Sequence, residues 1–278
     1  MQTSRSSWAS FICLSLGCAS TAHAADSHDA DELARQLANP VASLISVPLQ
    51  INQDDGIGPA DDGERLTINV QPVIPFALND RWNVISRTIV PVIHQSDIFP
   101  GAGSQTGRGD VLQSAFLSPR APTSTGWIWG VGPALLLKTS TDDLLGQEQW
   151  GAGPTAVLLK QHGPWTYGFL TNHLWRVAGD DDRPDVDATF AQPFLTYGLG
   201  QGQTVSLNFE STYDWTASEW NAPFHASYSK VTRFGSQLVS LAGGVRYYVD
   251  KPDSGADWGV RFTFTLLFPR APAQQAGP

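Results

Sequence analysis

The stretch "DWGVRFTFTLLF" (Asp257 to Phe268) decides the fold, because large apolar residues alternate in it with small or polar ones. The apolar set consists of Trp258, Val260, Phe262, Phe264, Leu266 and Phe268. The residues between them are Gly259, Arg261, Thr263 and Thr265. Successive side chains of a β-strand point to opposite faces of the sheet, so this pattern predicts a strand with one apolar and one polar face.

The same alternation recurs along most of the chain. "TVSLNFESTYDW" (Thr204 to Trp215) repeats it with Glu210 on the polar face, and "LTINVQPVIPF" (Leu66 to Phe76) begins in the same way. Residues that favour turns separate the stretches. Twelve strands are predicted, at residues 41–51, 65–76, 82–94, 108–118, 127–139, 151–161, 165–178, 186–197, 203–215, 224–232, 237–249 and 257–268.

The connections between these stretches alternate in kind. The first and every second one after it are mostly longer and acidic, and they hold 18 of the 26 Asp and Glu residues. The others are mostly short, and Asp80 is their single carboxylate. In an up-and-down meander all odd connections emerge at one end. Long loops at one end and short turns at the other are typical of an outer-membrane β-barrel, which is the predicted fold.

Tryptophan placement agrees with this fold. Apart from Trp8, every tryptophan lies near a predicted strand end or in a loop. Amphipathic rings at strand ends form the aromatic belts at the two membrane surfaces, so the sequence predicts an outer-membrane location.

The N-terminal 24 residues predict a secretory signal. Arg5 supplies the positive start, "FICLSLG" (Phe11 to Gly17) the apolar core, and "AHA" (Ala22 to Ala24) the cleavage site. Both cysteines precede that site, which excludes disulfides and zinc sites built on thiolates from the mature chain. The remaining organisation is a periplasmic or plug segment at 25–40, a barrel at 41–268 and a tail at 269–278.

Polar residues inside the predicted strands are candidates to line the lumen. A charge against lipid at mid-membrane costs about 2–4 kcal/mol, whereas in a wet lumen it costs little. Such residues either fill the interior or tune what passes. They are Arg87, Lys138, Asn208, Glu210, Arg246 and Arg261.

The acidic cluster "GDDDRPDVD" (Gly179 to Asp187) has two interpretations. Carboxylates are suitable ligands for calcium or magnesium, so weak cation binding at the rim is one, and a solvated loop is the other. The calcium-loop pattern fails because Pro184 and Asp185 stand where an acidic or amide ligand and a glycine are required. We expect no dedicated metal site and no cofactor. The carboxylates concerned are Asp180, Asp181, Asp182, Asp185 and Asp187.

Seven segments resemble one family of bacterial outer-membrane proteins, described as transporters or as "MetA-pathway of phenol degradation" proteins and sometimes misnamed neuromedin U. The segments are "NPVASLISVPLQ" (39–50), "INVQPVIPF" (68–76), "RWNVISRTIVPVI" (81–93), "WGVGPALLL" (129–137), "AGDDDRPDVD" (178–187), "QPFLTYGL" (192–199) and "WGVRFTFTLLFP" (258–269). The resemblance implies a β-barrel with a channel role. It supplies no catalytic residue.

The expected function is passive passage of small solutes, including hydrophobic or aromatic ones, through a narrow pore without a chemical step. The alternatives are a lipid-cleaving barrel enzyme using His173, and a structural or adhesive barrel acting through its acidic loops. The enzyme is disfavoured because no nucleophilic Ser stands at a clear offset from His173. Expected partners are outer-membrane lipid, lipopolysaccharide, the solute and the barrel-assembly machinery. The net charge of −9 argues against nucleic acid.

Overall fold

The computed structural model describes residues 29–269. The predicted signal peptide and nearly all of the predicted C-terminal tail lie outside these residues. Sixteen strand segments are present in the described part of the chain. They are β1 (Ile45–Ile57), β2 (Gly63–Val70), β3 (Val73–Ala77), β4 (Trp82–Ser96), β5 (Ser104–Arg108), β6 (Val111–Pro119), β7 (Trp127–Leu137), β8 (Gln149–His162), β9 (Trp165–Gly179), β10 (Asp187–Gly200), β11 (Gln203–Phe209), β12 (Ser211–Asp214), β13 (Glu219–Asn221), β14 (Pro223–Phe234), β15 (Gln237–Tyr248) and β16 (Trp258–Phe268).

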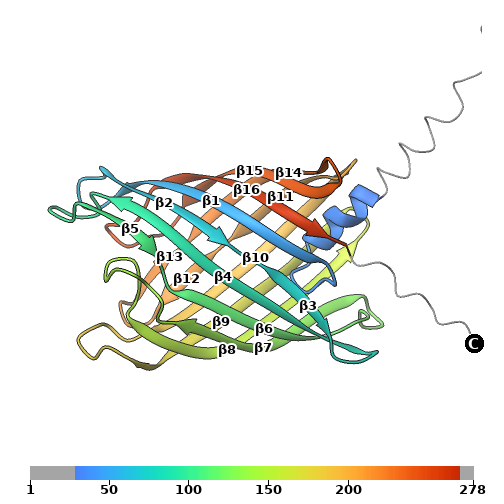
Figure 1. The fold of residues 1–278 in the computed structure, drawn as a ribbon, viewed down its shortest axis with the longest axis horizontal. Helices are drawn as coiled ribbons and strands as arrows, with labels where there is room; N and C mark the ends of the chain where they lie inside the picture. The colour runs from blue at the N-terminus through green and yellow to red at the C-terminus, as the bar shows by residue number, and fades with distance from the viewer. Residues whose placement is uncertain (1–28, 270–278) are drawn as a thin grey trace, which may run out of the picture.

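The segments form one closed antiparallel barrel of twelve strands (Figure 1). Four barrel strands are interrupted and each consists of two segments: β2 with β3, β5 with β6, β11 with β12, and β13 with β14. The first and last strands pair along their length, from Ile45 opposite Phe268 to Asp55 opposite Trp258. Every edge is therefore paired, as a sheet in lipid requires. The predicted fold class and strand number are confirmed.

The two ends of the barrel differ as the connections predict. One end, which we name the loop end, carries the connections at 58–62, 97–103, 138–148, 180–186, 215–218 and 249–257. The other, the turn end, carries those at 78–81, 120–126, 163–164, 201–202 and 235–236. Figure 1 shows the loop end at the left and the turn end, with the described N-terminus, at the right. Asp80 is the single carboxylate of the turn-end connections.

The outward face of the strands is apolar. Phe169, Leu195 and Phe262 are among its exposed large side chains, and such a surface is stable in hydrocarbon. Two aromatic belts bound it. At the turn end the belt holds Trp82, Trp127, Trp129 and Trp165, and at the loop end Trp150, Trp175, Trp215, Trp220 and Trp258.

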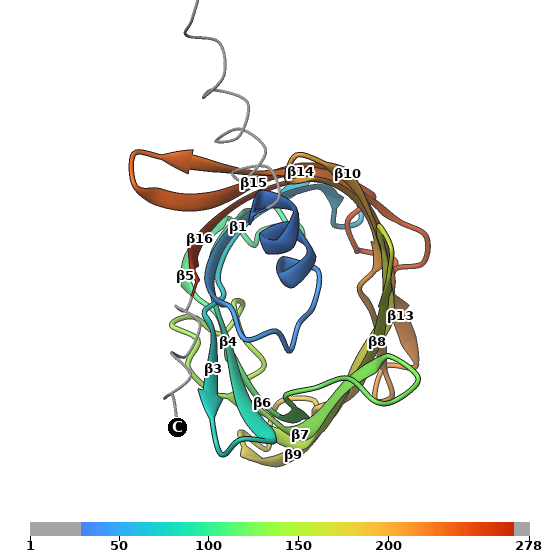
Figure 2. The ribbon, with the colours of Figure 1, turned by 90° about the vertical axis from the view of Figure 1, so that its right-hand side faces the viewer.

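The segment before β1 lies inside the barrel at the turn end (Figure 2). Residues 29–37 form a helix, whose Leu33 packs with Leu44, Val231 and Leu267. Asp31 accepts a hydrogen bond from the backbone N–H of Gly202 at 2.6 Å. We name residues 29–44 the plug. No helix among residues 29–269 is long and apolar enough to cross a membrane.

The plug corrects the predicted start of the first strand. Residue 41 was expected to begin that strand, but β1 begins at Ile45. Asn39 Oδ1 accepts the N–H of Val41 at 3.0 Å, which holds the chain in a turn. Val41 then enters an apolar cluster with Ile85 and Phe116 inside the barrel. Burial of this side chain therefore outweighs extension of the ladder.

Candidate solute pathway

A chamber of about 450 Å³ occupies the middle of the barrel. One side of its lining is polar and comes mainly from β1, β2, β15 and β16; this polar wall includes Gln50, Asn52, Asp54, Arg65, Thr67, Asn69, Arg246, Tyr248 and Arg261. The other side comes from β4, β6, β9 and β10. This apolar wall includes Ile89, Leu112, Phe116, Leu170, Leu174, Ala188 and Phe190. The strands of this wall also contribute the polar residues Arg87, Ser114, Asn172 and Gln192. A solute inside would therefore meet mainly charged and amide groups on one side, and apolar side chains with a few polar groups among them on the other.

Two ion pairs organise the polar wall. Arg261 donates from Nη1 and Nη2 to the two carboxylate oxygens of Glu210, at 2.8 and 2.9 Å. His225 Nε2 lies 3.2 Å from the same carboxylate. Arg246 Nη1 contacts Asp54 Oδ2 at 2.7 Å. Bidentate pairing fixes orientation as well as charge, so Glu210 and Arg261 tie the ninth and twelfth barrel strands across the lumen.

Two further arginines of the chamber form no ion pair with any described residue. Arg65 Nε donates to Gln95 Oε1 at 2.8 Å, and Arg87 Nη2 donates to Gln71 Oε1 at 3.2 Å. Both acceptors are neutral amides. Arg65 was absent from the predicted lumen residues because it stands at the edge of its stretch. The sequence nevertheless indicates its position. Leu66 and every second residue after it face outward, so Arg65, which precedes Leu66, faces inward.

Most of the predicted lumen residues lie inside the barrel. Alternation is the reason for expecting Glu210 and Arg261 there, and the cost of a charge against lipid is the reason for Arg87 and Arg246. Arg87, Glu210, Arg246 and Arg261 line the chamber. Asn208 lines a second cavity closer to the turn end. The burial of these side chains inside the barrel supports the inference that charge avoids the lipid face.

Lys138 is an exception and corrects the prediction. It was expected in a strand facing the lumen, but β7 ends one residue earlier, because Asp110 Oδ1 accepts the N–H groups of Thr139 and Ser140. Lys138 Nζ instead pairs with Glu148 at 2.7 Å in the loop-end connection 138–148. This contact raises the pKa of Lys138 and, together with a hydrogen bond from Ser140, lowers the pKa of Glu148.

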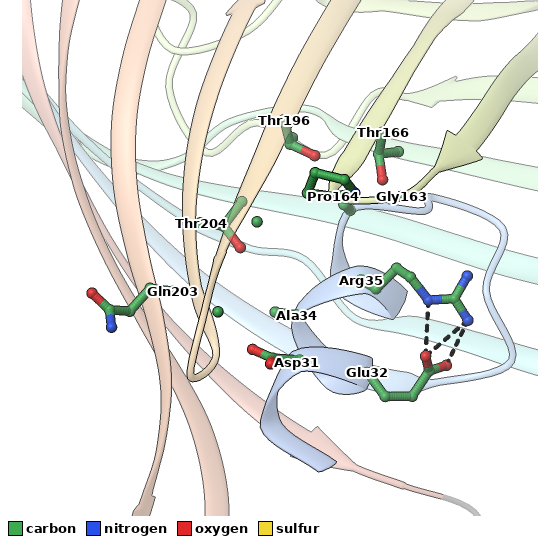
Figure 3. Close-up of a pocket in the computed structure, with 13 residues that line it drawn as sticks. Asp31, Glu32, Ala34, Arg35, Gly163, Pro164, Thr166, Thr196, Gln203 and Thr204 are labelled. Carbon is green, nitrogen blue, oxygen red and sulfur yellow. Dashed lines mark hydrogen bonds and ion pairs between the residues drawn. The ribbon is translucent and has the colours of Figure 1, made fainter. Parts of the chain in front are cut away.

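A series of cavities leads from the chamber past the plug. The second cavity, about 320 Å³, shares Gln50, Gln71 and Gln192 with the chamber. A third, also about 320 Å³, opens at the turn end and shares Ala34, Ala38, Thr196 and Thr204 with the second. Figure 3 shows the third cavity between the helix of the plug and the strand residues Thr196 and Thr204. Shared linings make these cavities consecutive.

The acidic cluster forms the connection between β9 and β10. Arg176 pairs with Asp181 and, at 2.9 Å, with Asp185. Arg183 donates to backbone carbonyls of Asp143 and Gly146 in the neighbouring loop. No group of three metal-ligating side chains gathers anywhere between residues 29 and 269. Cation binding at these aspartates therefore stays a prediction.

His173 lies on the outward face at the loop-end belt. Its Nδ1 lies 2.7 Å from Thr189 Oγ1 on the neighbouring strand, and its Nε2 lies 3.2 Å from Asp187 Oδ1. Trp215 donates its indole N–H to the same hydroxyl at 2.9 Å. This hydroxyl–imidazole–carboxylate order was missed because Thr189 is sixteen residues away in sequence and only strand register brings it opposite His173.

Comparisons with known proteins place the fold. No family model and no curated protein matches the sequence. The barrel is similar to the crystal structure of an outer membrane channel from Pseudomonas putida F1, with a TM-score of 0.64 and 14% identity over 81% of this chain and 96% of that one. The outer membrane phospholipase of Salmonella typhi matches with a TM-score of 0.46 and 13% identity over 84% and 97%. The β domain of a Bordetella autotransporter matches at 0.45 and 10%, over 81% and 100%.

One expectation is overturned. The prediction that the chain is not an enzyme is contradicted, because outer membrane phospholipase A, an enzyme barrel, is among the similar structures. The reason given for it was that no nucleophilic Ser stands at a clear offset from His173, but the structure places the hydroxyl of Thr189 next to the imidazole.

Proposed function

We propose that the protein is an outer-membrane channel that passes small amphipathic solutes between the loop end and the turn end, alongside the plug. The observation that carries this proposal is the series of three cavities that share lining residues. The similarity to an outer membrane channel supports it. The likeness to the family of phenol-degradation barrels belongs to the same proposal, as do the partners: outer-membrane lipid, lipopolysaccharide and the barrel-assembly machinery.

The chamber favours solutes with an apolar body. Passage requires contacts that are favourable but replaceable along the way. Leu170 and Phe190 offer apolar contact in the chamber, and the three glutamines shared by the first two cavities offer neutral hydrogen bonds. Hydroxyl groups of Thr196 and Thr204 continue the series of polar contacts to the turn-end opening.

Single-channel recording with cysteine variants tests the pathway. Both natural cysteines, Cys13 and Cys18, precede the described residues, so an introduced thiol in the barrel is unique there. Thr196→Cys places the thiol in the second and third cavities, and a bulky charged thiol reagent is expected to reduce the current by at least half. The matched control is Leu195→Cys, whose side chain faces outward. An unchanged current in modified Thr196→Cys contradicts the pathway.

A second candidate function, hydrolysis of lipid esters, has the His173 arrangement in its favour. Thr189 Oγ1 would attack the ester carbonyl, His173 would take its proton and pass it to the leaving alcohol, and Asp187 would stabilise the imidazolium. Water would then release the acyl group. Vesicle lipid hydrolysis by the purified protein, abolished in both His173→Ala and Thr189→Val, is the expected result for this candidate. No hydrolysis by the wild type removes it.

A further inference from the structure

We infer that the chamber binds the carboxylate of an amphipathic monocarboxylate at Arg87, with its hydrocarbon or aromatic body on the apolar wall. This inference rests on the proposed function and names the substrate class. Its first support is the charge of the chamber. Four arginines and two carboxylates line it, which leaves an excess of two positive charges in the lining.

Arg65 and Arg87 are the two arginines of the chamber that form no ion pair with a described residue. Asp54 and Glu210 already contact Arg246 and Arg261 at ion-pair distances of 2.7 and 2.8 Å. A cation in a confined site is stable when it is hydrated or when an anion reaches it. A guanidinium presents a planar fork that matches a carboxylate, so these groups suit a ligand with one such headgroup.

Arg87 combines this charge with an apolar neighbourhood. It precedes Ile89 on the inner face of β4, and both line the chamber. Arg87 and Leu170 also line a cavity beside the plug residues Leu37 and Pro40. The headgroup site and the apolar contact surface therefore lie together at the deep end of the chamber.

Arg65 lies at a different depth. It is in register with Gln95 of β4, whereas Arg87 stands eight residues earlier on that strand and opposite Val73. Eight residues correspond to roughly 26 Å along a strand, so one small ligand cannot contact both. Arg65 would attract the anion near the loop end, and Arg87 would hold it next to the plug.

The size of the chamber fits such a ligand. A volume of about 450 Å³ lies within the range of roughly 300–1,000 Å³ that small-molecule sites occupy. The polar wall on its own would suit any anion, including phosphate. The apolar residues beside Arg87, such as Ile89 and Leu170, favour a carboxylate with a body of several carbons.

Equilibrium binding to the purified full-length protein in detergent tests this site independently of flux. The probes are 4-phenylbutyrate and its neutral amide, measured by titration calorimetry. We expect the carboxylate to bind at least tenfold more tightly than the amide, and Arg87→Gln to weaken the carboxylate by about tenfold or more, about 1.4 kcal/mol. Binding of the amide should change less than about twofold. Arg233→Gln, which removes an exposed positive charge at the turn end, is the matched control.

The outcomes separate this inference from the channel proposal. Equal binding of the two probes, or unchanged carboxylate binding in Arg87→Gln, overturns the carboxylate site even when single-channel currents are present. Binding with the expected discrimination but without current supports the site and contradicts the channel. Arg87→Lys, which retains charge but loses the planar fork, guards against misfolding: it is expected to keep part of the preference for carboxylate.

Discussion

The loop-end rim and the lumen carry opposite charge balances. Carboxylates predominate in the loop-end connections. Lys138 and Lys251 in these connections, and Arg176 near the end of β9, each pair with one or two of them. Inside the barrel, arginines outnumber carboxylates. The rim lies in water and salt, which screen its charges, whereas the lumen is confined and screens little. An ion pair inside the barrel should therefore contribute far more to the free energy of unfolding than an ion pair at the rim.

The largest expected effect comes from breaking the Glu210–Arg261 pair. Arg261→Met leaves a carboxylate inside the barrel without its bidentate partner, and we expect the free energy of unfolding to fall by roughly 2–4 kcal/mol. Urea unfolding in lipid vesicles, followed by tryptophan fluorescence, measures it. The double variant Arg261→Met, Glu210→Gln should recover most of the loss, because no uncompensated charge remains.

The control for this prediction is at the rim. Lys251 pairs with Asp257 in the connection 249–257, and Lys251→Met should change unfolding far less because that pair is more exposed. Equal losses in Arg261→Met and Lys251→Met would show that confinement does not strengthen the lumen pair, and the comparison between rim and lumen would fail.

The next effect concerns ion selectivity. Asp180 and Asp182 form no ion pair among the described residues, so Asp180→Asn with Asp182→Asn should lower cation conductance at 0.1 M salt by less than about twofold. The difference should vanish at 1 M salt, where the Debye length is about 3 Å. Reversal potentials across a salt gradient measure this change in cation selectivity.

Arg87→Gln should shift selectivity toward cations at both salt concentrations, since the charge of Arg87 acts in the confined chamber. Loss of both effects at 1 M salt contradicts this distinction.

The strands of the barrel could largely be predicted because a strand that separates lipid from a wet interior follows a simple sequence pattern. Lipid on one side and a wet interior on the other require alternation, which Val260, Arg261 and Phe262 display directly. Loop parity then predicted that the two ends of the barrel differ, and the positions of tryptophan predicted the two aromatic belts. These signals are local or periodic, and they do not depend on knowing which strands meet.

The site was less predictable because its geometry depends on register and on the plug. The sequence places Glu210 and Arg261 on inner faces, but only closure of the barrel brings them into contact. Thr189 reaches His173 for the same reason. The local sequence predicts Val41 as the start of a strand. It belongs to the plug instead because its side chain is buried in an apolar cluster inside the barrel.

The smallest expected effect is at the Lys138–Glu148 pair of the rim. Hydrogen bonds from Lys138 and Ser140 lower the pKa of Glu148 below its ordinary value of 4.5. A lowered carboxyl pKa in the folded state stabilises the fold above the unfolded value, and the contribution is lost as pH falls through the folded value. Amide hydrogen exchange of residues 138–148 should therefore accelerate as pH drops below about 4.5, after correction for the intrinsic rate. Glu148→Gln should remove this added acid sensitivity while global unfolding scarcely changes, because the pair lies within the single connection 138–148 and its loss leaves the ladder of β7 and β8 intact.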